Sequence, residues 1–146
     1  MRLQVLNRGT AEVITVKVPH LFISIYSTDS TPANIKPNEF TLAILPIHFD
    51  DVEKDEVMYG TKVFPAITEA QATKIWEFVD LAMIAEVELI IVHCDAGTCR
   101  SPAVAAAIDL VINGDDTKWF QPPYLPNKKV YKTMLKVKGL SNDYSN

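Results

Sequence analysis

The fold is decided by residues 88–107, which read ELIIVHCDAGTCRSPAVAAA. The run from Leu89 to Val92 is short and wholly apolar, which is typical of a buried strand. The alanine-rich run after Ser101-Pro102 is typical of a helix, and a proline suits the first turn of one. The residues between these runs therefore form a tight loop from strand to helix, with a thiol at its start and a guanidinium at its end.

This loop has the chemistry of an oxyanion site. The first amides of the helix lack partners within it and, with the loop amides, can surround a tetrahedral anion. Gly97 permits the backbone angles of such a curl, and Arg100 offers a planar fork for two phosphate oxygens. The same positive surroundings favour the thiolate of Cys94, which is the nucleophilic form. The predicted phosphate-binding residues are Asp95, Ala96, Gly97, Thr98, Cys99 and Arg100.

Three further residues, Cys94, His93 and Ser101, have both a functional and an ordinary structural interpretation. A single cysteine is most often a small buried apolar side chain, but here several features at fixed offsets favour a nucleophile at Cys94. His93 is expected to orient the loop through a backbone hydrogen bond, the alternative being a simple buried histidine. Ser101 can donate a hydrogen bond to the sulfur when it leaves phosphorus, cap the helix, or do both.

The spacing Cys-x5-Arg-Ser, with His before the cysteine and Gly in the middle, resembles the signature of cysteine-dependent protein tyrosine phosphatases. Phe49-Asp50-Asp51 is similar to the general-acid loop of their dual-specificity branch, and Pro126-Asn127 with Val130-Tyr131 resembles the final helix of small members. The resemblance implies that Cys94 attacks a phosphomonoester, Arg100 holds its oxygens and Asp51 protonates the leaving group. Asp50 is the second choice for the acid and Asp55 the third.

The resemblance also bears on substrates and redox chemistry. A lysine-free, acidic loop rim disfavours polyphosphorylated ligands, so the expected substrate is a phosphorylated protein or a small phosphomonoester, with phosphotyrosine and phosphoserine or phosphothreonine both open. Tyr26, Phe49 and Tyr59 are candidates to line a shallow cleft, unless they are core residues. Low-molecular-weight tyrosine phosphatases also place a cysteine before Arg-Ser, which implies a protective disulfide between Cys94 and Cys99. A buried, unreactive Cys99 is the alternative.

Two other classes of function stay open. A catalytically inactive phosphate-binding module would keep the loop without turnover. A rhodanese-like sulfurtransferase also uses a loop cysteine in an α/β domain, although Gly97 and Arg100-Ser101 fit phosphate better.

Composition and charge limit the domain organisation, partners, location and cofactors that are expected. With 146 residues and 48% hydrophobic residues, we expect a single phosphatase-like domain spanning residues 1–146. The formal charge of −4 argues against nucleic acid and anionic membranes as partners. No long apolar run or signal peptide is evident, and two cysteines form no disulfide framework, so a cytoplasmic location is expected. The spacing of His20, His48 and His93 is not of the zinc type, so no metal or other cofactor is expected. The oligomeric state stays open.

Hydrophobic patterns predict the remaining elements. Apolar runs predict strands at residues 3–6, 13–18, 21–25 and 42–49, with a turn at Asn7-Arg8-Gly9 and an edge position or bulge at Pro46. Residues 50–60 are expected to form an acidic connector. A capping box at residues 68–71 opens a helix whose buried stripe is Ala72, Ile75, Trp76, Val79 and Met83. Further helices are predicted from Ala103 to Asn113 and after Asn127. Alternating strands and helices predict an α/β fold with a mainly parallel sheet and helices on both faces.

Overall fold

A four-stranded parallel sheet with the strand order β1-β6-β2-β3 forms the centre of the protein. The computed structural model describes residues 1–140. The strands are β1 (Arg2–Leu6), β6 (Leu89–His93), β2 (His20–Tyr26) and β3 (Thr41–His48). Because all four run in one direction, their carboxyl ends meet at a single edge of the sheet, where loops of α/β proteins usually carry function.

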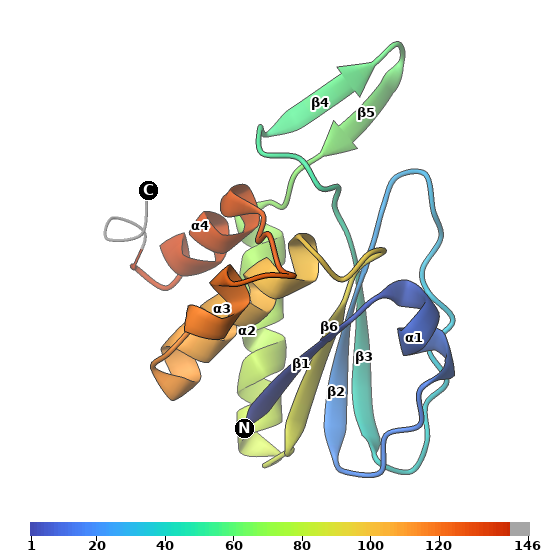
Figure 1. Ribbon diagram of the computed structural model, residues 1–146, viewed down its shortest axis with the longest axis vertical. Coiled ribbons are helices and arrows are strands. Elements are labelled where there is room, and N and C mark those ends of the chain that lie inside the picture. The colour runs from blue at the N-terminus through green and yellow to red at the C-terminus, as the bar shows by residue number, and fades with distance from the viewer. Residues whose placement is uncertain (141–146) are drawn as a thin grey trace.

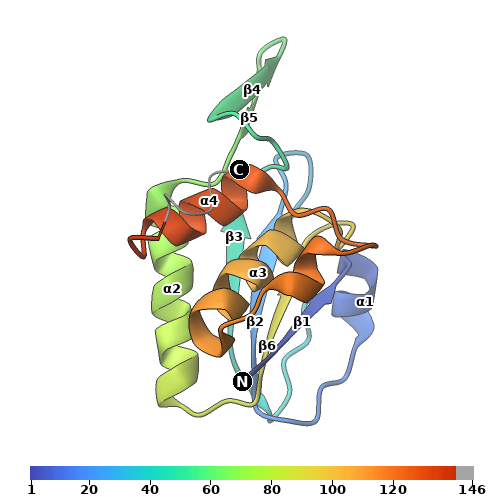
Figure 2. The same ribbon diagram turned by 60° about the vertical axis from the view of Figure 1, so that its left-hand side comes forward.

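Helices cover the two faces of this sheet unequally, as Figures 1 and 2 show. The helices α2 (Glu69–Ile84), α3 (Arg100–Asn113) and α4 (Lys128–Lys136) lie on one side, and the short α1 (Arg8–Val13) lies on the other. Each face buries its own apolar cluster. The predicted α/β fold, with a parallel sheet between helices, is confirmed.

Sequence patterns at the helix ends predicted three of the helices, α2, α3 and α4. In α2, the capping box of Thr68 and Gln71 is present, and four residues of the predicted stripe are buried. Met83 is the exception, with 49% of its surface exposed, because Ala82, one turn after Val79, faces the sheet instead. α3 ends at Gly114, whose φ of 81° is left-handed. The side chain of Asn127 caps α4, as predicted.

The predicted strand at residues 13–18 and the turn before it are wrong. Asn7 caps α1 instead, because its side chain accepts a hydrogen bond of 2.8 Å from the Thr10 amide. The chain then leaves the helix at Val13, which is 74% exposed. Ala11 and Val16 are buried against a sheet face, so their apolar character reflects packing and not strand pairing.

The expected acidic connector at residues 50–60 is also partly wrong, because its second half forms the first strand of a hairpin. Strands β4 (Glu56–Tyr59) and β5 (Lys62–Pro65) pair with each other antiparallel, and Figure 1 shows the hairpin projecting from the body. Its base is closed where the Asp50 amide donates to the Pro65 carbonyl at 2.7 Å. The hairpin thus forms its own two-stranded sheet directly after the Phe49-Asp50-Asp51 segment.

The predicted edge position of Pro46 can be compared with the sheet. Pro46 lies in β3, which pairs only with β2 among residues 1–140, so the predicted edge position is confirmed.

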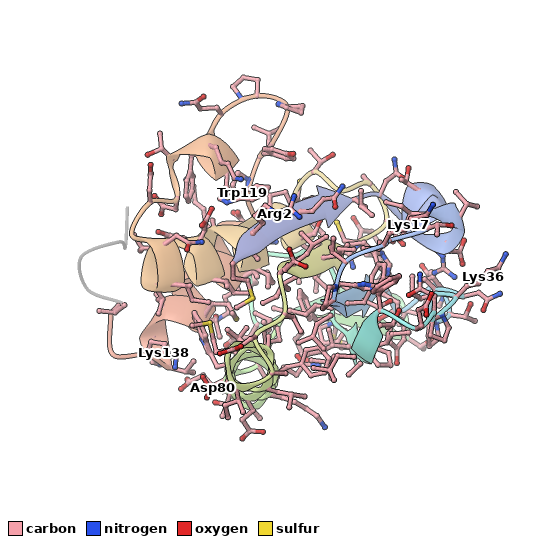
Figure 3. The ribbon with its side chains drawn as sticks, turned by 90° about the horizontal axis from the view of Figure 1, so that it is seen from below. Arg2, Lys17, Lys36, Asp80, Trp119 and Lys138 are labelled. Carbon is pink, nitrogen blue, oxygen red and sulfur yellow. The ribbon has the colours of Figure 1, made fainter. Side chains whose placement is uncertain are left out.

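Figure 3 views α2 end-on, with Asp80 on its outer side and Trp119 on the far side of the molecule. Trp119 belongs to the 3-10 turn η1 (Thr117–Phe120), and its ring nitrogen donates to the buried Asp109 at 2.9 Å. Within residues 1–140, no helix is both long and apolar enough to cross a membrane.

Candidate active site

The loop between β6 and α3 is a tight turn that depends on Gly97. This residue has a φ of 72°, which favours glycine. A Cβ atom there would lie only 2.9 Å from the Asn7 amide nitrogen and 2.9 Å from the Leu6 carbonyl carbon. The loop is therefore pressed against the end of β1, where the Arg8 amide also donates to the Asp95 carbonyl at 3.1 Å.

The sulfur of Cys94 lies inside this turn. The Gly97 amide donates to Sγ at 3.3 Å, and the hydroxyl of Ser101 lies 3.1 Å from the same sulfur. Cys94 is 2% exposed and Ser101 is fully buried. An amide, a hydroxyl and the first turn of α3 thus surround Sγ.

Arg100 is fixed from the ends of three strands. Its Nη1 atom donates to the Phe49 carbonyl at 2.9 Å, after β3, and to the Ser27 hydroxyl at 2.8 Å, after β2. Its Nη2 atom donates to the Asp95 carboxylate at 3.1 Å, after β6. Among residues 1–140, the Nε hydrogen and the second Nη2 hydrogen have no acceptor. These two donors are available for a bidentate oxyanion.

Asp95 and Ser27 support that guanidinium from the side. The Ser27 hydroxyl donates to the Asp95 carboxylate at 2.8 Å, which closes a triangle with Arg100. Burial alone would raise the pKa of Asp95, but hydrogen bonds from Ser27 and Arg100 and the positive charges nearby outweigh it and lower the pKa. Asp95 is therefore a carboxylate in the resting site. Ser27 was not predicted, and only its position after a buried strand hinted at a role.

His93 holds the start of the loop. The ring is fully buried, its Nδ1 lies 3.2 Å from the Cys94 carbonyl, and its Nε2 lies 2.6 Å from the Ser24 hydroxyl. The expected backbone contact is present. Burial is the main reason that the pKa of His93 is lowered, which favours a neutral ring in a structural position.

The three candidate acids have different surroundings. Asp50 is 6% exposed and accepts a hydrogen bond of 3.0 Å from the Thr28 amide, so its carboxylate is enclosed in the protein. Asp55 lies at the base of the hairpin, where a hydrogen bond and the charge of Lys129 lower its pKa. Asp51 is exposed, and its side chain hydrogen-bonds to Cys99 of the loop.

The carboxylate of Asp51 contacts both Asn127 and Cys99. The Asn127 side-chain amide donates to it at 2.7 Å. The pKa of Cys99 is raised, first by burial and then by the charge and hydrogen bond of Asp51. Cys99 is thus a thiol beside the Phe49-Asp50-Asp51 segment, which is called the acid loop below because it carries the candidate acid Asp51. Cys94 and Cys99 are both free thiols in this structure.

The three aromatic residues named as candidates to line a cleft lie in three different environments. The Phe49 ring is fully buried in the core, and only its carbonyl reaches Arg100. Tyr26 stacks on His48 with ring centroids 5.2 Å apart, and Tyr59 is 75% exposed on the hairpin.

A shallow pocket of about 700 Å³, open to solvent, adjoins the loop and is lined by Arg8, residues 28–31, Lys62 and Asp95. In the part of the chain that the structure describes, no three His, Cys, Asp or Glu side chains are grouped to hold a metal ion.

Comparison with known proteins identifies the fold. No family model and no curated protein matches the sequence. Among solved structures, the human tyrosine phosphatase-like serine/threonine/tyrosine-interacting protein is 17% identical with a TM-score of 0.65, over 94% of this chain and 91% of that one. Human DUSP28 is 16% identical with a TM-score of 0.58, over 97% and 94%. A single-substitution variant of DUSP28 is 17% identical with a TM-score of 0.62, over 97% and 92%. The chain therefore has the fold of the dual-specificity phosphatases.

Proposed function

We propose that this protein is a cysteine-dependent phosphatase that hydrolyses phosphomonoesters through a cysteinyl-phosphate intermediate. One observation carries the proposal: the Cys94 sulfur is hydrogen-bonded to the Gly97 amide and the Ser101 hydroxyl within a tight turn, and the nearby Arg100 keeps two donors without an acceptor among residues 1–140. An ordinary buried cysteine has no need of such a site.

The first chemical step transfers the phosphoryl group to sulfur. The Cys94 thiolate attacks phosphorus, an S–P bond forms and the P–O bond to the leaving group breaks. Arg100 and the loop amides hold the phosphoryl oxygens throughout. Asp51 gives its proton to the departing oxygen, so that an alcohol or phenol leaves instead of an alkoxide or phenoxide.

The second step releases inorganic phosphate. Asp51, now a carboxylate, takes a proton from a water molecule that attacks phosphorus. The S–P bond then breaks, and the Ser101 hydroxyl donates a hydrogen bond to the departing thiolate of Cys94. Asp51 is restored as an acid and Cys94 as a thiolate, which closes the cycle.

Both parts of the mechanism are tested with para-nitrophenyl phosphate under reducing conditions. We expect Cys94→Ser to abolish turnover, Asp51→Asn to lower kcat by about 10²-fold or more, and Asp50→Asn to lower it far less. Wild-type turnover that survives Cys94→Ser, or no turnover by a folded wild-type protein, would contradict the proposal. Transfer of sulfur from thiosulfate to cyanide would point to a sulfurtransferase instead.

The substrate class is proposed from the surroundings of the loop. The adjoining open pocket has room for groups attached to the phosphoester, and its wall carries two cations, Arg8 and Lys62, and two carboxylates, Asp29 and Asp95. The loop itself, from Asp95 to Cys99, has no lysine that could hold a further phosphate. We infer a phosphorylated protein or a small monophosphate and not a polyphosphorylated ligand. Hydrolysis of phosphotyrosine, phosphoserine and phosphothreonine peptides by the wild-type protein will rank the three.

A further inference from the structure

Asn127 joins two segments of the candidate site that are far apart in the sequence. It is 3% exposed and immediately precedes α4. Its backbone amide donates to the Cys99 carbonyl at 2.9 Å, which fixes it to the phosphate loop. Its side-chain oxygen accepts from the Val130 amide at 3.0 Å, which is the helix cap. The sequence predicts only this last contact.

The side-chain nitrogen of Asn127 makes hydrogen bonds that are separate from the helix cap. Nδ2 donates to Oδ1 of Asp51 at 2.7 Å and to the Val52 carbonyl at 3.2 Å. A helix cap requires only the side-chain oxygen, so these two bonds exceed what capping needs. They tie the acid loop to the same residue that is bonded to the phosphate loop.

The geometry points to Asn127 as the positioning residue of the general acid. By holding Oδ1 of Asp51, it fixes the carboxyl group beside the Cys99 thiol, so that the other carboxyl oxygen can carry the proton toward the leaving group. Because Asn127 is buried and bonded to Cys99 and Val130, it sets where Asp51 lies relative to the loop that holds phosphate. Small errors in such placement lower rates strongly. This inference rests on the proposed phosphatase function.

The substitution Asn127→Ser separates positioning from capping. Serine caps a helix about as well as asparagine, but it lacks the amide that reaches Asp51. Thr68→Ala is the matched control, since it removes a helix cap at α2 without touching the acid loop. If Asn127→Ser does not fold, Asn127→Asp retains the cap and turns a carboxylate toward Asp51.

The readout is the dependence of kcat/KM on the leaving group. A poor leaving group such as phenol needs the acid, whereas dinitrophenol does not. We expect Asn127→Ser to lower kcat/KM on phenyl phosphate about tenfold or more, with a loss of about threefold or less on dinitrophenyl phosphate. In an Asp51→Asn background, the same substitution should change neither rate further.

The outcomes are distinct. Equal losses on both substrates, no loss on either, or the same pattern in Thr68→Ala would overturn the positioning role and leave the phosphatase proposal intact. Wild-type turnover that is absent or independent of Cys94 would overturn the phosphatase proposal, and the positioning role with it.

Discussion

Arg100 illustrates how the site is built residue by residue. Two of its hydrogen bonds go to groups after β3 and β2, and the third goes to a neighbour in its own loop. The guanidinium is therefore oriented before any ligand arrives, and less rotamer freedom is lost on binding. The same loop places the sulfur of Cys94 beside the first turn of α3, 3.1 Å from the Ser101 hydroxyl.

Gly97 should not tolerate a side chain. We predict that Gly97→Ala lowers the free energy of unfolding by about 1–3 kcal/mol and lowers turnover, because alanine is strained at this φ and its Cβ meets backbone of the β1–α1 junction. Gly60→Ala is the control: its φ is also positive, at 62°, but a Cβ meets nothing within 4 Å. Urea unfolding of both variants tests this; equal costs would show that the close contact is unimportant.

His93 should make the protein less stable in acid. Its pKa in the folded state is lowered by burial from the ordinary 6.5, so the unfolded chain binds more protons as the pH falls. The stabilisation is full above about pH 6.5 and is lost as the pH falls toward the folded-state pKa. His93→Gln can bond Ser24 but does not titrate in this range. Urea unfolding at pH 7.5 and 5.5 should show a larger loss for the wild type; parallel losses would contradict this.

Among the elements, the hairpin β4–β5 is the most independent. Its strands pair with each other, and the Ala66 amide donates to the Asp55 carbonyl at 3.0 Å, so the two ends of the hairpin already meet. Met58, Tyr59 and Val63 are exposed on it. The hairpin is therefore an addition to the sheet and not one of its supports.

Replacing residues 57–64 by a short Gly-Ser turn should leave the body folded. We expect a change in Tm of a few degrees, because few core residues lose contacts and a shorter connection costs little entropy. Thermal unfolding and para-nitrophenyl phosphate turnover test this. A loss of turnover in a variant that unfolds at the wild-type temperature would show that the hairpin holds the Asp51 segment in place.

At the scale of the whole molecule, stability should depend on the central strands far more than on the edge. β6 lies between β1 and β2, and Ile91 is fully buried. We predict that Ile91→Ala costs about 2–5 kcal/mol of unfolding free energy through the cavity it leaves. Leu42→Ala, on the edge strand β3 with the leucine 47% exposed, should cost less than about 1 kcal/mol. Similar costs in urea unfolding would contradict this ranking.

Features that depend only on neighbouring residues along the chain could be predicted from the sequence. Residues 88–114 predicted a strand, the phosphate loop and a helix ended by Gly114, because apolar runs, a proline and a terminal glycine act locally. The cap of α2 and the edge proline of β3 followed from the same kind of signal. The spacing from Cys94 to Arg100 likewise indicated the candidate site.

Which distant groups meet at the candidate site follows from the three-dimensional fold and not from local sequence. Val16 has the apolar character of a strand residue, but it is buried on a sheet face without pairing, and the hairpin after Asp55 carried too weak an alternation to predict. Ser27 and Asn127 reach the site from segments far from Cys94 in the chain. Parallel strands bring their carboxyl ends to one edge whatever their distance in sequence, and no local pattern records which residues then come into contact.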